Sequence, residues 1–263
     1  MGKIIFNRRR LLGQIGAGAS LLMLGGCDVF DGVLNTDNSV RKFLTKANAL
    51  TKNVQHALQG PMPMAREYPA SAIREGQRPN GSIDPQTEDY LAVKKNNFAG
   101  YRLKVRGLVD RPLSLSLDEL RAMPSRTQIT RHDCVEGWSC ISQWTGVQLS
   151  RVLDKAGIKP AARYVVFRCY DSMDETPSGP SYYYESVDLV GARHPQTILA
   201  YGLNGQTLPI ANGAPVRVRI EQQLGYKMAK YIRAVDVVDS FANIADGYGG
   251  YWEDRGYDWY AGS

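Results

Sequence analysis

Two neighbouring runs decide the fold class: W-T-G-V-Q-L-S-R-V-L-D-K-A-G, from Trp144 to Gly157, and Y-V-V-F-R-C, from Tyr164 to Cys169. The first run has helical spacing of its apolar residues, which are Leu149, Val152, Leu153 and Ala156. Gly157 is a typical end to such a helix. The second run begins with four apolar residues and predicts a buried strand that ends at Cys169.

The chain before these runs predicts one strand and one short helix. Apolar and cationic residues alternate from Tyr101 to Gly107, which indicates a strand with one buried face. Ser116 is a suitable N-cap for a short helix that continues to Met123 and stops at Pro124.

The chain after them predicts further strands. An Asn204-Gly205 turn between apolar runs at 197–201 and 207–210 favours a hairpin. A strand over 216–220 places its aliphatic residues on one face and two arginines on the other, and 231–238 is a further strand. Strands outnumber helices and do not alternate with them, so we expect a strand-rich mixed α+β fold rather than a doubly wound sheet.

The chain divides into three expected segments. Residues 1–27 resemble an export signal, 28–60 a tether with a surface helix over 40–58, and 61–263 a single large domain. Within that domain, residues 61–99 are irregular and rich in Pro, Gly and Asn, a composition typical of segments that line sites. The tail from Tyr248 to Ser263 is rich in aromatic residues, and we expect it to pack on the domain or to dock a partner, with packing favoured.

The expected export segment has the features of a twin-arginine signal. Arg8, Arg9 and Arg10 precede an apolar stretch that is too short and too rich in glycine to span a bilayer. An ordinary basic signal or a short anchor is the alternative. Leu24-Gly25-Gly26-Cys27 resembles a lipobox, which would lipidate Cys27 and attach the protein to a membrane surface, although plain cleavage also suits these residues. We therefore expect a periplasmic protein.

The charge balance excludes a nucleic-acid-binding class. Four cations and no acids precede Cys27, so the formal net charge of +6 falls to +2 once that segment is removed. No Lys/Arg stripe follows. Nucleotide-binding glycine motifs and the G-x-S-x-G motif of serine hydrolases are also absent from the sequence.

Cys134 lies in the polar run R-H-D-C-V-E-G-W-S, from Arg131 to Ser139, where a routine core cysteine is unexpected. A thiolate there suits a transition metal. Two alternatives are a nucleophile paired with His132 and a disulfide with Cys140. Cys134, Cys140 and Cys169 follow Cys27, so an odd number leaves one thiol outside any intramolecular disulfide.

A second polar constellation lies downstream, in N-G-A-P-V-R from Asn212 to Arg217 and G-Y-K-M-A-K from Gly225 to Lys230. An arginine and two lysines three residues apart suit the oxygens of a phosphate. Taken alone, this segment is more typical of a solvated basic face.

Together these motifs, in the order C-V-E-G-W-S, W-T-G-V-Q-L-S-R-V-L, Y-V-V-F-R-C, N-G-A-P-V-R and G-Y-K-x-x-K, resemble the molybdenum-cofactor domain of the sulfite oxidase family. The resemblance covers roughly 61–241 and is greatest to the bacterial branch that includes the periplasmic methionine sulfoxide reductase catalytic subunit.

The resemblance implies a mononuclear molybdenum held by one molybdopterin and by Cys134. It implies pterin contacts from Asn212 and Arg217, and phosphate contacts from Lys227 and Lys230. Cys169 stands where the similar branch has a cofactor-contacting threonine, and we expect its side chain to face the cofactor. Asn80, in a Pro79-Asn80-Gly81 stretch, resembles another cofactor-lining residue, and a cofactor inserted before export agrees with twin-arginine export of folded cargo.

The residues after Cys134 bear on the substrate. Typical sulfite oxidases continue with A-G-N-R-R, whereas Glu136 and Trp138 here supply an acid and an aromatic ring. We therefore expect Glu136 and Trp138, with His132, to line a pocket for a neutral S-oxide or N-oxide. No haem-binding motif is present in the sequence, so electrons are expected from a membrane haem protein or a periplasmic cytochrome.

Three alternatives stay open on the sequence alone. One is a sulfite-oxidising enzyme of the same family. Another is an exported lipoprotein that has lost the metal and serves as a binding module. The third is a thiol–disulfide protein that uses Cys134 and Cys140.

Overall fold

The computed structural model of the chain describes residues 63–74, 77–177 and 179–262, together with Phe43 and Lys46. Contacts divide the chain into two units, 1–53 and 54–263, and every element named below belongs to the second. The expected export segment and the lipobox at Cys27 lie outside the described residues. So does the expected surface helix over 40–58, except that Phe43 and Lys46 are helical and exposed.

The first sheet has five strands in the order β2-β1-β10-β5-β6. Their bounds are Leu113–Leu115, Leu103–Gly107, Ile232–Val238, Tyr164–Thr176 and Gly179–Asp188. Strands β1 and β10 pair in parallel, and the other neighbours are antiparallel. The parallel pair brings residue 104 opposite residue 234, although 130 positions separate them, and makes the sheet one long-range unit.

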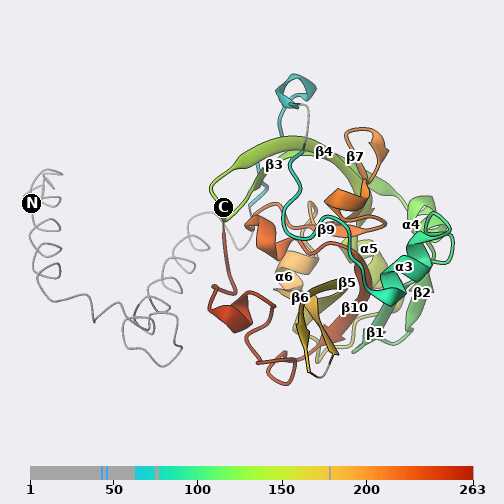
Figure 1. Cartoon of the computed structure of the whole chain (residues 1–263), viewed down its shortest axis with the longest axis vertical. Helices are drawn as coiled ribbons and strands as arrows, with labels where there is room; N and C mark the ends of the chain where they lie inside the picture. Colours follow the sequence, from blue (N-terminus) through green and yellow to red (C-terminus); the bar gives the residue numbers. More distant parts are fainter. Residues whose placement is uncertain (1–42, 44–45, 47–62, 75–76, 178, 263) are drawn as a thin grey trace, which may run out of the picture. The chain divides into compact units, whose positions relative to one another are not determined.

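The second sheet has the order β3-β4-β7-β8, with β9 paired to β7. Their bounds are Ser125–Asp133, Ser139–Gln148, Ile198–Leu203, Gln206–Thr207 and Arg217–Arg219. Strands β3 and β4 form a long antiparallel pair whose connecting turn lies beside the C-terminal segment (Figure 1). That turn contains Cys134.

The helices are short: α3 (Glu88–Lys94), α4 (Leu117–Ala122), α5 (Leu149–Ala156) and α6 (Leu189–Ala192). The expected helices after Ser116 and from Leu149 are confirmed. Ser116 accepts a hydrogen bond from the Glu119 N–H, and the Glu119 carboxylate accepts one from the Ser116 N–H, which completes a capping box. The two sheets and the few short helices confirm the expected strand-rich α+β class.

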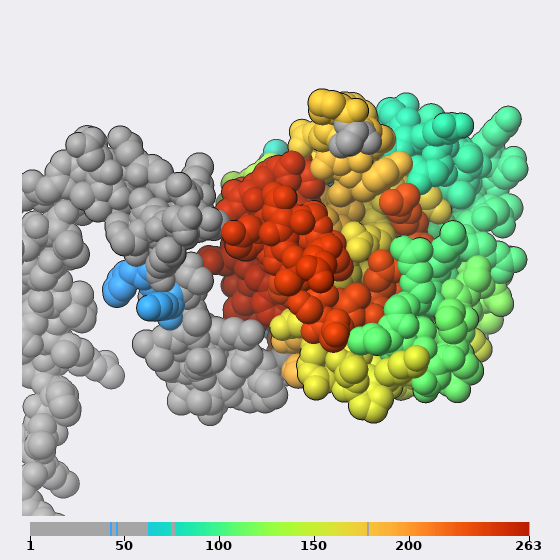
Figure 2. All heavy atoms as spheres, turned by 90° about the horizontal axis from the view of Figure 1, so that it is seen from below, coloured from blue at the N-terminus to red at the C-terminus, as the bar shows by residue number. Residues whose placement is uncertain are grey.

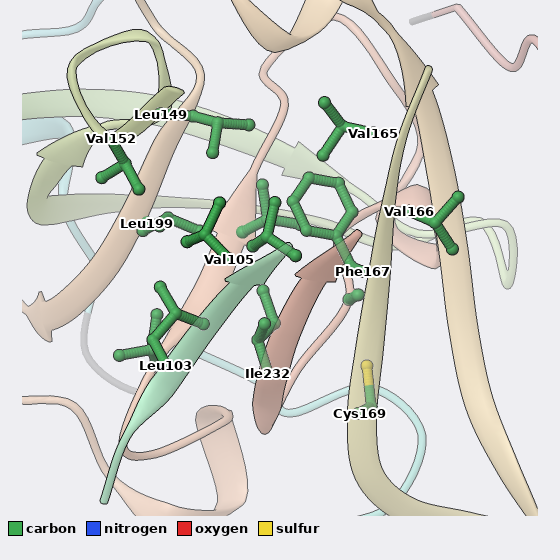
Figure 3. Packing of buried hydrophobic residues seen from close by; sticks show 14 of the residues in the cluster. Leu103, Val105, Leu149, Val152, Val165, Val166, Phe167, Cys169, Leu199 and Ile232 are labelled. Atoms are coloured by element: carbon green, nitrogen blue, oxygen red, sulfur yellow. The ribbon is translucent and has the colours of Figure 1, made fainter. Parts of the chain in front are cut away.

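The main core lies between α5 and the inner face of the first sheet (Figure 3). Leu103 and Val105 on β1 are fully buried, while Lys104 and Arg106 between and after them are exposed on the opposite face. Val152 on α5 is also fully buried in this cluster. The alternation of apolar and cationic residues that predicted β1 therefore reflects a strand with one buried and one exposed face.

Three sequence expectations need correction. Strand β5 does not end at Cys169 but continues to Thr176, because its polar last residues pair with β6 in a hairpin. Helix α3 lies in the segment expected to be irregular. Tyr90 is the one buried residue of this helix, so its sequence shows no helical pattern of apolar residues. Arg217 and Arg219 do not lie on a polar face of β9, since both are buried.

None of the helices in the described part of the chain has the length and apolar character needed to cross a membrane.

Candidate functional site

Cys134 is held in a tight turn between β3 and β4. The Cys134 N–H donates to the Trp138 carbonyl at 2.9 Å, and the Gly137 N–H donates to the Cys134 carbonyl at 3.0 Å. Gly137 has φ +87°, a left-handed conformation that favours glycine and closes the turn. The turn presents the largely buried thiol to a cavity of about 190 Å³.

Distant parts of the chain build the walls of this cavity. They are the segment 80–82, the Cys134 turn, strands β5 and β6, the loop 225–230 and the C-terminal segment. Side chains that line it include Asn80, Ser82, Glu136, Asp171, Met173, Tyr183, Tyr226, Met228, Lys230, Trp252 and Tyr257. The expectation that the irregular segment before α3 lines a site is confirmed by Asn80 and Ser82.

Burial is the main influence on the Cys134 thiol and raises its pKa above the usual value. The Glu136 carboxylate raises the pKa further, whereas the Glu136 backbone N–H and the Arg78 guanidinium lower it. The free thiol is therefore protonated at neutral pH. A bound metal cation would reverse this preference, because a coordinating thiol loses its proton.

Glu136 and Trp138 interact directly. The Trp138 indole N–H donates to the Glu136 carboxylate at 2.8 Å. The Arg78 guanidinium lies 5.3 Å from the centre of the Trp138 ring, and the His132 ring lies 5.6 Å away on centroids. The Glu136 carboxylate and the Arg78 guanidinium thus both lie near Trp138 and act on the Cys134 thiol in opposite directions.

His132 is fully buried on β3. Burial, and then the charge of Arg219, lower its pKa well below the usual value, so the ring is neutral. Its Nδ1 lies 2.8 Å from Nη1 of Arg219 and accepts a hydrogen bond from it. The Arg219 guanidinium also donates twice to the Glu221 carboxylate, at 2.9 and 2.6 Å. His132 is held as a structural acceptor rather than as the base of a Cys134 nucleophile.

Lys230 and Asp171 place opposite charges on one cavity wall. Burial, then the charge of Arg217, lower the pKa of Lys230 to about 7, and its ammonium donates to the carbonyls of Ser82 and Ala211. Burial raises the pKa of Asp171 to about 6. Its Oδ2 accepts from the Ser82 hydroxyl at 2.8 Å, while its buried Oδ1 has no protein partner.

Lys227 points elsewhere. Its buried ammonium contacts the carboxylates of Glu185 on β6 and Glu253 in the C-terminal segment. Burial lowers its pKa, but these two carboxylates outweigh that effect and the net direction is upward. Lys227 does not line the Cys134 cavity, so the three-residue spacing in the sequence does not bring both ammonium groups to one site.

Arg217 and Asn212 lie in the interior. Arg217 donates to the carbonyls of Asn212, at 3.0 Å, and Met228, at 3.1 Å, while its Nε has no protein partner. Burial, then the charge of Arg219, lower the Arg217 pKa to about 9. The Asn212 amide donates to the Gln77 carbonyl at 3.3 Å. Neither residue lines the Cys134 cavity itself.

Asn80 and Cys169 differ in position. Asn80 lines the Cys134 cavity, and its amide lies 3.5 Å from the Gly225 carbonyl. Cys169 is fully buried in the main core on β5, near Ile232 (Figure 3), and borders a neighbouring cavity of about 360 Å³. Cys134, Cys140 and Cys169 are all free thiols, so the Cys134–Cys140 disulfide is not formed in the described structure.

Several residues of the cavity wall lie in stretches of sequence without a distinctive local motif. Asp171 and Tyr183 lie on strands beyond the expected end of β5, and Met228 falls between the two lysines. The aromatic tail expected to pack on the domain lines the cavity through Trp252 and Tyr257. Figure 2 shows the tail in orange-red spread over one face of the molecule, beside the β5–β6 hairpin.

The described residues contain no cluster of three or more His, Cys, Asp or Glu side chains arranged to hold a metal ion. Cys134 supplies the thiol among the residues that line the cavity of about 190 Å³.

The sequence model described as "Oxidoreductase molybdopterin binding domain" matches residues 90–243. Over 243 residues the chain is 40% identical to the "Putative protein-methionine-sulfoxide reductase subunit YedZ1" of Azospira oryzae, covering 92% of this chain and 85% of that protein. It is also 36% identical over 167 residues to the "Protein-methionine-sulfoxide reductase catalytic subunit MsrP" of Xanthomonas axonopodis pv. citri, covering 61% of this chain. That match spans 52% of the MsrP subunit, about half its length.

Among solved structures, the sulfane dehydrogenase SoxCD of Paracoccus pantotrophus aligns with a TM-score of 0.47 at 23% identity. The alignment covers 54% of this chain and 39% of that chain.

Proposed function

The chain belongs to the family of oxidoreductases with a molybdopterin-binding domain, and from this premise we propose that it is an exported molybdenum enzyme that reduces a neutral S-oxide or N-oxide. The reaction would convert a sulfoxide, two electrons and two protons into a sulfide and water. The relatives named as methionine-sulfoxide reductases support this direction of oxygen transfer.

The residues present fit a molybdopterin with one protein ligand. Cys134 presents a thiol to the cavity, and Asp171 Oδ1 on the cavity wall is a buried polar atom without a protein partner. Two further buried atoms in the interior, Arg217 Nε and His132 Nε2, also lack a protein partner. Such atoms suit the polar edges and phosphate of a pterin, because a buried polar group without a partner is costly. Lys230, with Asn80 and Ser82 beside it on the cavity wall, would hold the cofactor's phosphate end, and a single pterin is part of the proposal.

Once bound, the cofactor would supply the two-electron oxygen-atom transfer, and the chain would supply binding, orientation and proton handling. Cys134 would hold the metal as a thiolate. Trp138, fixed by its hydrogen bond to Glu136, would keep that carboxylate at the mouth of the cavity. Asp171, with a pKa of about 6, is suited to hold and release a proton at Oδ1 near neutral pH.

The observation that carries the choice of substrate is the charge around Cys134. Glu136 and Arg78 act on the thiol in opposite directions, and the acids Glu136 and Asp171 line the cavity together with Lys230, so its lining lacks the excess of cations that would favour a dianion such as sulfite. A neutral S=O or N–O group needs hydrogen-bond donors and little net charge. An aromatic wall of Trp252, Tyr257 and Tyr226 suits its apolar substituents.

Metal and pterin analysis tests the cofactor. We expect one molybdenum and one pterin per chain in the protein purified from its own host, lost in Cys134→Ser and kept in the matched control Cys140→Ser. A metal-free wild-type protein would instead support the binding-module alternative.

A substrate screen tests the reaction. With reduced viologen as electron donor, the loaded enzyme should reduce methionine sulfoxide, dimethyl sulfoxide or trimethylamine N-oxide. Efficient oxidation of sulfite together with no reduction of any oxide would overturn the proposal and favour the sulfite-oxidising alternative.

The location is also part of the proposal. We propose twin-arginine export to the periplasm, attachment through a lipid on Cys27, and electrons delivered by a membrane haem protein or a periplasmic carrier. Mass spectrometry of the mature N-terminus distinguishes a lipidated Cys27 from a plainly cleaved chain, and replacement of Arg8 and Arg9 by lysine should block export.

A further inference from the structure

The outer face of the first sheet carries a groove of about 600 Å³ that is separate from the Cys134 cavity. Five cationic side chains line it: Arg102 just before β1, Lys104 and Arg106 on β1, Arg168 on β5 and Arg233 on β10. Asp89 on α3 is the acid among its lining residues. Arg102 pairs with Glu119, Arg106 and Arg168 share Asp236, and Arg233 pairs with Asp89, so five cations of the groove face three acids and the surface carries an excess of positive charge.

The alternation of β1 produces this surface. Leu103 and Val105 point into the core, so Lys104 and Arg106 must point outward from the opposite face. The register then aligns Lys104 with Ala234 on β10, and Ala234 with Arg168 on β5. A small residue between two cations leaves the groove open.

The arginines of the groove keep unused hydrogen-bond donors. Arg102 contacts Glu119 through Nη1, Arg168 contacts Asp236 through Nε, and Arg233 contacts Asp89 through Nη1. A guanidinium has five N–H donors, so each retains an edge that fits a second carboxylate. Lys104 makes no ion pair with any residue in the described part of the chain.

The groove adjoins the Cys134 cavity through one intervening cavity. Arg168 and Arg233 line both the groove and the cavity of about 360 Å³ that borders Cys169. Tyr183 in turn lines both that cavity and the Cys134 cavity. A protein bound at the groove would thus be separated from the proposed redox centre at Cys134 by the cavity that Tyr183 lines.

From these observations we propose that this groove is the docking surface for an acidic electron-donor protein. The proposal rests on the proposed function, because it names the partner class that would supply its two electrons. Neighbouring strands are about 4.8 Å apart, so the backbones at Lys104 and Arg168 are separated by roughly 10 Å. A row of Asp and Glu side chains on a protein surface matches cations distributed over that spacing.

The test uses the full-length holoenzyme and a reduced acidic [2Fe–2S] ferredoxin as the probe. The double variant Arg102→Gln/Lys104→Gln removes two exposed cations of the groove. The matched control Arg151→Gln/Lys155→Gln removes two exposed cations from α5, which packs against the inner face of the same sheet. Binding is measured by calorimetry at low and high salt, and turnover is measured with ferredoxin and, separately, with reduced viologen.

We expect the groove variant to bind ferredoxin roughly tenfold more weakly than the wild type, with a smaller dependence on salt, because complementary charges govern such encounters. The KM for ferredoxin should rise while viologen-driven turnover stays unchanged. Equal binding by the groove variant and the α5 control would overturn the proposal. Binding to phosphatidylglycerol vesicles but not to ferredoxin would also overturn it and assign the face to a membrane surface.

Failure of the proposed function gives a different result. In that case viologen-driven oxide reduction is absent from the wild type, yet ferredoxin binding and its loss in the groove variant still report on the surface.

Discussion

The ammonium of Lys227 contacts the carboxylate of Glu253, and this buried ion pair joins the loop that forms one cavity wall to the C-terminal segment that forms another. Glu185 on β6 supplies a second carboxylate to the same ammonium. Burial raises the pKa of Glu185 well above its usual range. One buried cation therefore contacts two buried acids, and the position of the C-terminal segment depends on these contacts.

Replacing Lys227 by methionine should be strongly destabilising. The change keeps much of the side-chain volume but leaves two carboxylates buried without a cation, a loss of about 3–5 kcal/mol in the free energy of unfolding. Urea denaturation at pH 7 measures it.

The companion variant Glu253→Gln removes one of the two acids and keeps an acceptor for Lys227. It should cost much less, on the order of 1 kcal/mol. A Lys227→Met protein as stable as the wild type would show that the ion pair contributes nothing to the attachment of the tail.

A second prediction concerns Gly225, which passes close to the His132 ring. A Cβ atom at residue 225 would lie 2.6 Å from His132 Nε2 and 2.7 Å from Cε1. The ring cannot move easily because Arg219 fixes its Nδ1. Gly225→Ala should therefore lower the unfolding free energy by roughly 1–3 kcal/mol, as overpacking does, measured by thermal and urea denaturation.

Gly100→Ala is the matched control, since a Cβ there meets no atom within 4 Å. It should change stability little. If both alanine variants behaved alike, the close approach of residue 225 to His132 would not constrain the loop.

The sequence predicted those strands and helices that have one face buried in the core and the other face exposed to solvent. Strand β1 and helix α5 each alternate apolar and polar residues with the period of their element, because one face of each meets the core and the other meets solvent. Strand β9 gives a misleading signal. Its arginines alternate with Val218, which suggests a strand with one solvent face, but all three residues are buried.

The site was predictable in part for a related reason. Cys134 and Asn80 stand in distinctive local runs, and both line the cavity. The sequence could not show that Lys230 lines the cavity while Lys227 forms a buried ion pair, because the partners of Lys227 are Glu185 and Glu253. Those acids are distant in sequence, and nothing in their local runs marks them as partners of a lysine.

A third prediction uses the pH dependence of Asp171. Burial raises its pKa from 3.8 to about 6, so the folded chain holds this proton more strongly than the unfolded chain. The stability it contributes is fully present below pH 3.8 and is lost as pH rises through about 6. This difference is worth roughly 3 kcal/mol. Asp171→Asn cannot titrate, so the unfolding free energy of the variant should gain on that of the wild type between pH 4 and 7.

Denaturation of the cofactor-free chain at several pH values measures this gain. Asp118→Asn, at an exposed position of α4, is the control for the loss of one carboxylate. A difference between Asp171→Asn and wild type that is constant across the range would mean that Asp171 has an ordinary pKa.

The last prediction concerns the effect of Glu136 on the Cys134 thiol. Burial is the main cause of the raised pKa, and the Glu136 carboxylate raises it further because a nearby negative charge disfavours the thiolate. Glu136→Gln removes that charge and keeps the backbone N–H that stabilises the thiolate. The pKa of Cys134 should fall, and iodoacetamide should alkylate it faster at pH 8, since the thiolate is the reactive form.

In a cofactor-free Cys140→Ser background, Cys134 is the accessible thiol among the described cysteines, because Cys169 is fully buried. The Asp118→Asn change provides a matched loss of charge far from the turn and should leave the rate unaltered. An unchanged rate in Glu136→Gln would show that solvent screens the carboxylate from the sulfur, which would also remove the electrostatic argument for a neutral substrate.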